Sequence, residues 1–430
     1  MLTSLLLYAW GGVSYTGILV GSILLNYGVG LCLRGRGKRW WLTLGIVANL
    51  AVLAYFKYAM FALGQANDLA HLLGKTGWTI PRITLPLGIS FYTFQAISYL
   101  VDTFRGTTPA QRNPFRLGLY ISFFPQLIAG PIVRYQDMNR QLQERYTSWE
   151  NTAQGLERFI SGLAKKVLIA NTLAVVVEEI FSLDFTAMDP LTAWAGVLLY
   201  AAQIYYDFSG YSDMAIGLGL LFGFRLPENF DFPYASRSIR EFWRRWHITL
   251  GAWFRDYLYI PLGGSRGGQW LTARNLLLVF LATGLWHGAA WAFVLWGLWH
   301  GLFIVLERQR WWPLRGVWYA LPVVLLGWVL FRTESLGLSL QYYAAMFGLN
   351  ADTTAFDWAF YWSAEQTVAA AVALAGCWPW WQRFLNELPE TGAAGNVLAV
   401  GKIILLLALF LLCTNALVNN NLNPFIYFRF

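Results

Sequence analysis

Long apolar runs follow one another along this 430-residue chain. A helix needs about 20 mostly apolar residues to cross a bilayer, and most of these runs approach or exceed that length. The candidate spans are 3–31, 41–64, 84–103, 157–182, 191–222, 275–290, 291–306, 317–332, 361–379 and 398–418. The pattern predicts an all-α polytopic membrane protein, a single domain over residues 1–430 with about ten transmembrane helices.

The run at 117–133, LGLYISFFPQLIAGPIV, is apolar but short, and it contains Pro125, Gly130 and Pro131. Proline and glycine interrupt a helix, and irregular backbone at membrane depth is tolerated only where protein surrounds it. We therefore expect a re-entrant or broken segment here.

The segment 225–270 is basic and aromatic and too polar to span a membrane. Its Ser238–Glu241 sequence, SIRE, is a capping box that predicts a helix start, and Pro261 predicts the end. Apolar residues then fall on one helical face: Ile239, Phe242, Trp243, Trp246, Leu250, Trp253 and Tyr257. We expect one amphipathic helix lying in the membrane interface on the cytoplasmic side.

Polar residues of the same segment fall on the other side of this predicted helix. They are Arg240, Arg244, Arg245 and Arg255, which we expect to face the cytoplasm or phosphate groups, while His247 lies at the edge of the apolar face. The glycine-rich stretch 263–268, with Arg266, is either a phosphate cradle or only a flexible turn.

Composition supports a membrane protein, because 57% of residues are hydrophobic and only 13% are charged, against about 25% charged in soluble domains. The mean hydropathy is +0.45. The formal net charge of +8 gathers in alternate loops, as the positive-inside rule describes, so it does not require a nucleic-acid partner. Placing the basic loops in the cytoplasm puts the carboxyl terminus outside.

Several kinds of site have no sequence signature here. Cys32, Cys377 and Cys413 lack paired spacing and are interpreted as core residues, and no metal motif or serine nucleophile elbow is present. The start, MLTSLLLYAW, shows no cleavable signal peptide. GLGLLFG at 217–223 is a helix-packing pattern, because no strand precedes it.

Two of the four histidines lie in GLWHGAAWAFVLWGLWHG, residues 284–301, where Gly-Leu-Trp-His-Gly occurs twice. On one continuous helix His287 and His300 would be rotated apart by about 220°, so they would not face one site. His300 lies near Glu307 and Arg308, where we expect a packing or interfacial role. His287 lies between apolar runs and is flanked by Gly284 and Gly288, which predicts a helix end deep in the protein.

An ionisable group within a span is by default a functional candidate, and a neutral imidazole can accept and donate a proton near pH 7. His287 is therefore favoured as a catalytic group, with packing as the alternative. His247 is its possible partner, or else a surface aromatic of the amphipathic helix. Asp207 and Asp213 stand beside Gly210, where they line a cavity, pair with an arginine, cap broken helix ends or act as proton-relay groups.

Four motifs in order resemble the membrane-bound O-acyltransferase family, and in particular its bacterial polysaccharide branch, the alginate O-acetylation type. They are FPQLIAGPIVRY (124–135), YYDFSGYSDMAIGLGLLFGF (205–224), the run 229–268 and GLWHGAAWAFVLWGLWHG. The similarity extends from about Leu5 to the terminal NPFIYFRF. Relatives have a further hydrophobic helix before LLLYAW, which here begins at Leu5.

The resemblance implies a many-helix fold around a tunnel that an acyl donor enters from the cytoplasm and an acceptor from the other side. The family's near-invariant Trp-His-Gly-Ala histidine corresponds to His287, and its second polar position, in Arg-Trp-His, corresponds to His247. Nothing in that pattern corresponds to His300.

The expected activity is an acetyltransferase of the bacterial inner membrane, with His287 as base and His247 assisting. Acetyl-CoA or a related donor is the substrate, no cofactor is bound, and the phosphates meet Arg244, Arg245, Arg255 and Arg266. The acetyl group passes to a periplasmic serine-type partner that modifies an exported polysaccharide. Alternatives are D-alanyl transfer to teichoic acid, peptidoglycan O-acetylation, a transporter or flippase coupled through Asp207 and Asp213, and a non-catalytic scaffold.

Overall fold

The computed structural model describes residues 1–128, 130–380, 389 and 391–419. No described residue lies in a strand longer than an isolated bridge, and two such bridges join Met188 to Thr354 and Phe230 to Trp246. The predicted all-helical class is confirmed. The terminal NPFIYFRF motif lies outside the described residues.

The first half of the chain runs through α1 (Leu2–Gly11), α2 (Val13–Cys32), α3 (Lys38–Leu72), α4 (Ile89–Arg105), α5 (Pro114–Ser122), α6 (Phe124–Leu127), α7 (Tyr135–Met138), α8 (Trp149–Ala164), the π-helical η1 (Lys165–Ala170), α9 (Asn171–Ser182) and α10 (Pro190–Leu221). The second half runs through the 3-10 turn η2 (Pro233–Ala235), α11 (Ile239–Arg245), α12 (Ile248–Phe254), the π-helical η3 (Arg255–Tyr259), α13 (Gly268–His287), α14 (Trp291–Leu306), α15 (Val317–Thr333), α16 (Leu336–Met346), α17 (Trp358–Tyr361), α18 (Ala364–Gly376) and α20 (Gly392–Asn419).

Four helical stretches in the described part are long and apolar enough to cross a membrane unaided: Val13–Cys32, Lys38–Leu72, Trp149–Ser182 and Gly392–Asn419. α14 and α15 are apolar but only 16 and 17 residues long, short of the roughly 20 that a full span needs. The multi-pass membrane character is therefore supported, and the count of about ten spans stays a prediction.

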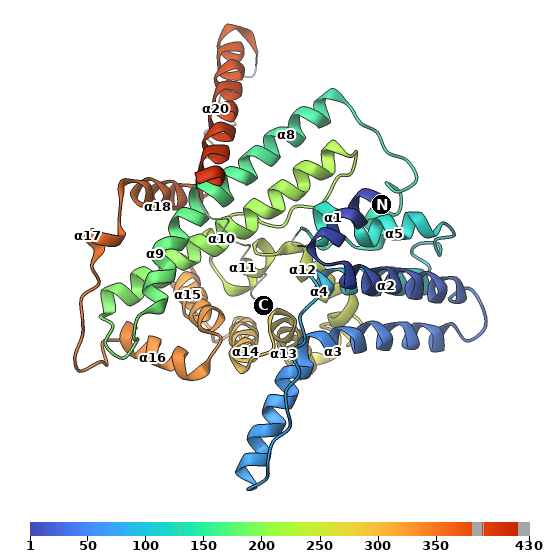
Figure 1. Cartoon of the computed structure of the whole chain (residues 1–430), viewed down its shortest axis with the longest axis horizontal. Coiled ribbons are helices and arrows are strands. Elements are labelled where there is room, and N and C mark those ends of the chain that lie inside the picture. The colour runs from blue at the N-terminus through green and yellow to red at the C-terminus, as the bar shows by residue number, and fades with distance from the viewer. Residues whose placement is uncertain (129, 381–388, 390, 420–430) are drawn as a thin grey trace.

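Helices α8 and α10 run side by side across the molecule, as Figure 1 shows, with η1 and α9 continuing the contact along α10. α13, α14 and α15 pack next to one another near the centre of the same view. The largest hydrophobic core joins α9 and α10 to α11 and α13–α16. A second core joins α1–α7 to Ile216 of α10 and to Phe224 and Leu226 after it, and a smaller core joins α4 and α12 to Trp286.

Two glycine contacts let α8 and α10 approach closely. A Cβ atom added at Gly217 in α10 would lie 2.5 Å from the carbonyl oxygen of Gly155 in α8, and one added at Gly162 would lie 2.6 Å from that of Gly210. Small residues at such contacts let helix backbones pack against each other. The prediction that 217–223 is a packing pattern is confirmed at Gly217.

Of the two predictions made for irregular or interfacial segments, one is confirmed and the other is wrong. The expected break within 117–133 is confirmed, because α5 ends at Ser122 and α6 ends at Leu127, and its described residues lie mostly buried. The single amphipathic helix predicted from Ser238 to Pro261 is wrong. The chain leaves the helix at Trp246 and His247, and then resumes as α12 and η3.

The apolar face of that segment also packs inward. Ile239, Phe242, Trp246 and Leu250 are each at most 1% exposed and contact other helices of the protein, so the face that we expected to lie in the lipid interface belongs to the core. Cys377 and Cys413 are buried and Cys32 is half-buried, all as free thiols.

The Gly217→Ala variant tests the α8–α10 contact. The added methyl group must push two backbones apart, so we expect a loss of about 1–3 kcal/mol in the free energy of unfolding. Gly21→Ala in α2 is the matched control, because nothing lies within 4 Å of the Cβ position there. Thermal unfolding of the detergent-purified variants measures both, and equal melting temperatures would contradict the role of the contact.

Candidate active site

His287 is the last residue of α13 and is only 2% exposed. Gly288 continues in an extended conformation and α14 begins at Trp291, so the predicted helix end deep in the protein is confirmed. Aromatic rings surround the imidazole. Its centroid lies 4.9 Å from that of Trp286, 4.9 Å from that of Trp296 and 5.2 Å from that of Phe331.

Two residues of α3 hold the end of α13 in place. Lys57 donates from Nζ to the carbonyl oxygens of Trp286 (2.5 Å) and His287 (3.0 Å), and the Tyr58 hydroxyl donates to the carbonyl oxygen of Leu285. The last carbonyls of a helix lack intrahelical partners, and a cation there also complements the helix dipole. Neither residue was predicted from the sequence, although a lysine inside the predicted span 41–64 is a signal of function.

Glycines fix the approach of α14 to this point. A Cβ atom added at Gly284 would lie 2.2 Å from the carbonyl oxygen of Phe293, and one added at Gly297 would lie 2.2 Å from that of Phe280. The two Gly-Leu-Trp-His-Gly copies thus place their first glycines at the same helix crossing. Gly284 of α13 and Gly297 of α14 therefore belong to a single contact between the two helices.

His300 lies in α14 and is completely buried, which supports the packing role among the two alternatives for this residue. Its ring stacks on Phe242, with centroids 6.1 Å apart, and contacts Trp243 and Trp296 at 5.4 and 5.2 Å. The expectation that the two histidines face apart is wrong, because a break separates their helices and both contact Trp296.

His247 is completely buried in the break between α11 and α12, and does not lie at the edge of a continuous helix. Its backbone is left-handed, with a φ of 45°. Its ring lies 4.7 Å from that of Phe208 and 5.9 Å from that of Trp286. Nδ1 lies 3.1 Å from Oδ1 of Asn229.

The three buried histidines therefore form one cluster, in which His247, Trp286, His287, Trp296 and His300 alternate through successive ring contacts. Indole rings exclude water and leave the imidazole nitrogens as the titratable groups of the cluster. A neutral imidazole in such a place can accept a proton from a bound hydroxyl group.

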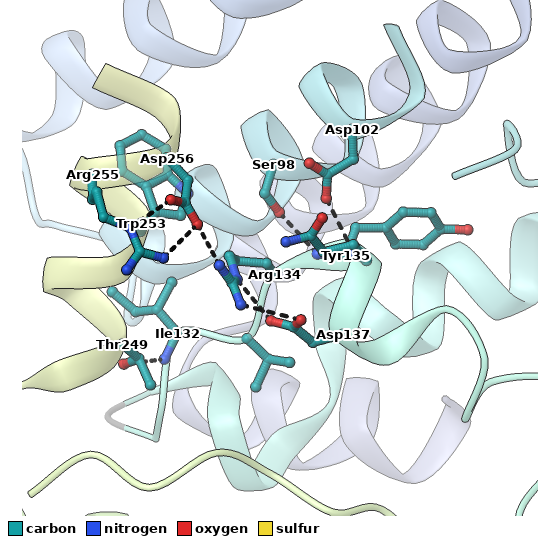
Figure 2. Close-up of polar contacts among 12 residues, drawn as sticks. Ser98, Asp102, Ile132, Arg134, Tyr135, Asp137, Thr249, Trp253, Arg255 and Asp256 are labelled. Carbon is teal, nitrogen blue, oxygen red and sulfur yellow. Dashed lines mark hydrogen bonds and ion pairs between the residues drawn. The ribbon is translucent and has the colours of Figure 1, made fainter. Parts of the chain in front are cut away.

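The motif at 124–135 contacts α12 and η3 through Ile132 and Arg134, as Figure 2 shows. The backbone N–H of Ile132 donates to Thr249 Oγ1 at 3.0 Å, and Arg134 forms an ion pair with Asp256. Asp256 also accepts from Arg255 at 2.7 Å. The Arg255 guanidinium is therefore held by Asp256, and this geometry does not support its predicted contact with a donor.

A second support in the same view is Asp102 of α4. Its carboxylate accepts from the backbone N–H of Gln136 at 3.1 Å, and from the Tyr257 hydroxyl at 2.8 Å. The backbone N–H of Tyr135 donates to Ser98 Oγ at 3.2 Å. These contacts fix the loop that follows the broken segment against α4 and η3.

A basic pocket of about 520 Å³ opens beside α11. It is lined by Asp231, Ser238, Arg240, Glu241, Arg244, Arg245, Glu307 and Arg315. The structure thus brings the predicted Arg244 and Arg245 together with two further arginines, Arg240 and Arg315. Arg266 is exposed in the loop before α13 and does not line the pocket.

Charges around the pocket are only partly neutralised. Arg245 pairs with Glu241 at 2.9 Å, whereas no described residue forms an ion pair with Arg240 or Arg244. Glu307 instead accepts from the backbone N–H groups of Ile239 (2.5 Å) and Arg240 (3.1 Å), and so fixes the start of α11. The pocket keeps two available guanidinium groups, which suit phosphate oxygens.

The pocket connects to the histidine cluster through aromatic rings. Trp243, between the pocket residues Glu241 and Arg244, contacts His300, which in turn contacts Trp296 beside His287.

Asp207 and Asp213 lie on an unbroken α10, so they do not cap helix ends at Gly210. Asp207 pairs with Lys166, and Asp213 pairs with Arg158 (2.7 Å) and Lys165 (2.6 Å). The predicted pairing with an arginine is confirmed for Asp213. Both carboxylates serve to join α10 to α8 and η1.

Comparison with known proteins gives a consistent result. Residues 113–311 match the profile of MBOAT, the membrane-bound O-acyltransferase family. The chain is 46% identical over 362 residues to the probable alginate O-acetylase AlgI of Azotobacter vinelandii, covering 81% of this chain and 72% of that protein. It is 41% identical over 392 residues to the peptidoglycan O-acetyltransferase of Helicobacter pylori, covering 81% and 73%.

A more distant relative is the teichoic acid D-alanyltransferase of Bacillus subtilis, which is 29% identical over 222 residues, covering 47% of this chain and 54% of that protein. The similarity to the acetylases is the more extensive of the two. Together with the multi-pass helical fold and the buried Trp-His-Gly-Ala histidine, these findings show that the chain belongs to the membrane-bound O-acyltransferase family and is an O-acyltransferase.

Proposed function

We propose that this chain passes an acetyl group from a cytoplasmic donor across the inner membrane for O-acetylation of an exported polysaccharide of the alginate type, with His287 as catalytic base. The observation that carries the proposal is the burial of His287 at the end of α13 among aromatic rings. The proposal is also supported by similarity to a probable alginate O-acetylase, which matches 81% of this chain.

The chemistry assigned to His287 is general-base catalysis. A ring nitrogen of the neutral imidazole takes the proton of the acceptor hydroxyl as its oxygen attacks the thioester carbonyl. The C–S bond then breaks, and the proton passes to the departing thiolate. An acetyl ester and a free thiol are formed, and the imidazole returns to its neutral state.

The proposed donor is acetyl-CoA or a related phosphate-bearing thioester. Support comes from Arg240 and Arg244, which line the basic pocket without an ion-pair partner among the described residues. Phosphate oxygens at these guanidinium groups would orient the thioester arm toward Trp243 and the histidine cluster. His247 lies in the same cluster, in an assisting position.

The acceptor that receives the acetyl group is proposed to be a hydroxyl of a periplasmic serine-type partner, which then modifies the polysaccharide. Peptidoglycan O-acetylation is the second candidate, favoured by the similarity to the Helicobacter pylori enzyme over the same share of this chain. D-alanyl transfer has less support, because that relative matches only 47% of the chain. Coupled transport through Asp207 and Asp213 has the least support, because both carboxylates are paired with cations that join helices.

His287→Ala tests the proposed base. We expect the acetyl content of the exported polysaccharide to fall by about 10²-fold or more, because no other group takes the hydroxyl proton. His300→Ala is the matched control, since it removes an equally buried imidazole from the same cluster, and most activity should remain. Membrane abundance of both variants is measured alongside, and retained acetylation in His287→Ala would overturn the assignment.

Arg240→Gln and Arg244→Gln test the donor pocket. Loss of either guanidinium should raise the KM for acetyl-CoA by about tenfold, with little change in kcat, because a charged hydrogen bond to phosphate is lost. Arg266→Gln removes an exposed arginine outside the pocket and serves as the control. If all three variants show the same KM as the wild type, the phosphates bind elsewhere.

A further inference from the structure

Asn229, between α10 and η2, is 1% exposed and controls the turn that contains His247. The backbone N–H of Ile248 donates to the carbonyl oxygen of Asn229 at 3.0 Å, and that of Asp231 donates to the carbonyl oxygen of Arg245 at 2.9 Å. This short antiparallel pairing interrupts the helix. It holds His247 in its left-handed conformation.

The side chain of Asn229 also meets the imidazole, and the directions of the hydrogen bonds can be worked out from backbone donors. The Ile132 N–H donates to Thr249 Oγ1 (3.0 Å), so that oxygen is an acceptor there and its own hydrogen remains available. Thr249 Oγ1 then donates to Asn229 Oδ1 at 2.9 Å, and the Thr249 N–H donates to the same Oδ1 at 3.3 Å.

Asn229 Oδ1 is therefore an acceptor, and the other end of the amide, Nδ2, donates to Ser212 Oγ at 3.0 Å. His247 Nδ1, which lies 3.1 Å from Oδ1, must carry the hydrogen in that contact. A neutral imidazole has one N–H and one lone pair, so its Nε2 is left as a pure acceptor. Nε2 is buried and has no hydrogen-bond partner among the described residues.

This acceptor lies inside the histidine cluster. The ring of His247 contacts that of Trp286, which contacts that of His287. A buried polar atom without a partner costs free energy, and a ligand that satisfies it regains that free energy on binding. Nε2 suits a neutral N–H or O–H group and does not suit a carbonyl, carboxylate or phosphate oxygen.

We propose that Asn229 is a positioning residue that holds His247 as its Nδ1–H tautomer, so that Nε2 accepts a hydrogen bond from a neutral donor group of a substrate. The identity of that substrate rests on the function proposed above. The group is either an amide N–H in the arm of the acetyl donor or a hydroxyl of the acceptor. In either case His247 does not stabilise an oxyanion, since its only N–H is already engaged.

The first test reads the tautomer directly and needs no activity. The chain has only four histidines, so full-length protein labelled with ¹⁵N-histidine in lipid gives few signals, and His247→Gln identifies the one of interest. We expect His247 to be protonated at Nδ1 in the wild type and in Asn229→Asp, whose carboxylate keeps the acceptor. In Asn229→Ala the Nδ1–H tautomer of His247 should no longer be the main form.

Asn26→Ala is the matched control, because it removes another fully buried asparagine, one that bonds to Asn49 away from the cluster. It should leave the His247 signal unchanged. A wild-type His247 protonated at Nε2, or an unchanged signal in Asn229→Ala, would overturn the proposal whatever the protein's activity.

The second test is a double-mutant cycle on acetyl transfer from acetyl-CoA to alginate oligosaccharide, in membranes that also contain the periplasmic serine-type partner, with acetyl-CoA and the partner titrated in turn. Asn229→Ala and His247→Gln should each raise the KM of the same substrate by about tenfold, and the double variant should match His247→Gln alone. The substrate whose KM rises identifies the hydrogen-bond donor. Independent, multiplying effects would show that Asn229 is merely structural, whereas an inactive wild type would instead contradict the proposed function.

Discussion

A helix that ends inside apolar surroundings leaves its last carbonyl oxygens without partners, and no water is present to satisfy them. That constraint governs the centre of this molecule. α13 ends at His287, and Lys57 and Tyr58 of α3 bring the donors that the last carbonyls need. Without them the break would be costly, because these carbonyl oxygens would stay buried without hydrogen-bond donors.

The rest of the site depends on how closely helices can approach that break. Gly284 and Gly297 let α13 and α14 cross with almost no space between their backbones, which brings both copies of the repeated motif to the same tryptophan. Asn229 produces a second break, at His247, by pairing its backbone with the neighbouring turn. Two interrupted helices therefore supply three imidazoles to one apolar interior, and α11 joins that interior to the arginine pocket.

Local pattern was enough to predict much of this arrangement. The apolar runs predict most of the helices, and the glycines that flank His287 predict the helix end there. The break at His247 could not be predicted in this way, because the 3.6-residue periodicity continues straight through it from Ile239 to Tyr257. What interrupts the helix is a backbone pairing with Asn229 and Asp231, and periodicity carries no information about such a partner.

Contacts distant in sequence account for the other differences. Lys57 is 230 residues from His287, and the cations that pair with Asp207 and Asp213 come from α8 and η1. A continuous helix would turn His287 and His300 to different sides. The break after His287 instead allows both rings to contact Trp296. Among the four arginines assigned to the donor, only Arg244 and Arg245 reach the pocket, because Arg255 is held by Asp256 and Arg266 lies in an outer loop.

The central claim is that one site extends from the arginine pocket to His287. An experimental structure of the full chain with a non-hydrolysable acetyl-CoA analogue tests it most directly. We expect phosphate density at Arg240 and Arg244, and the acetyl group beside the His287 ring. An analogue bound with its acetyl group away from the histidine cluster would contradict the claim.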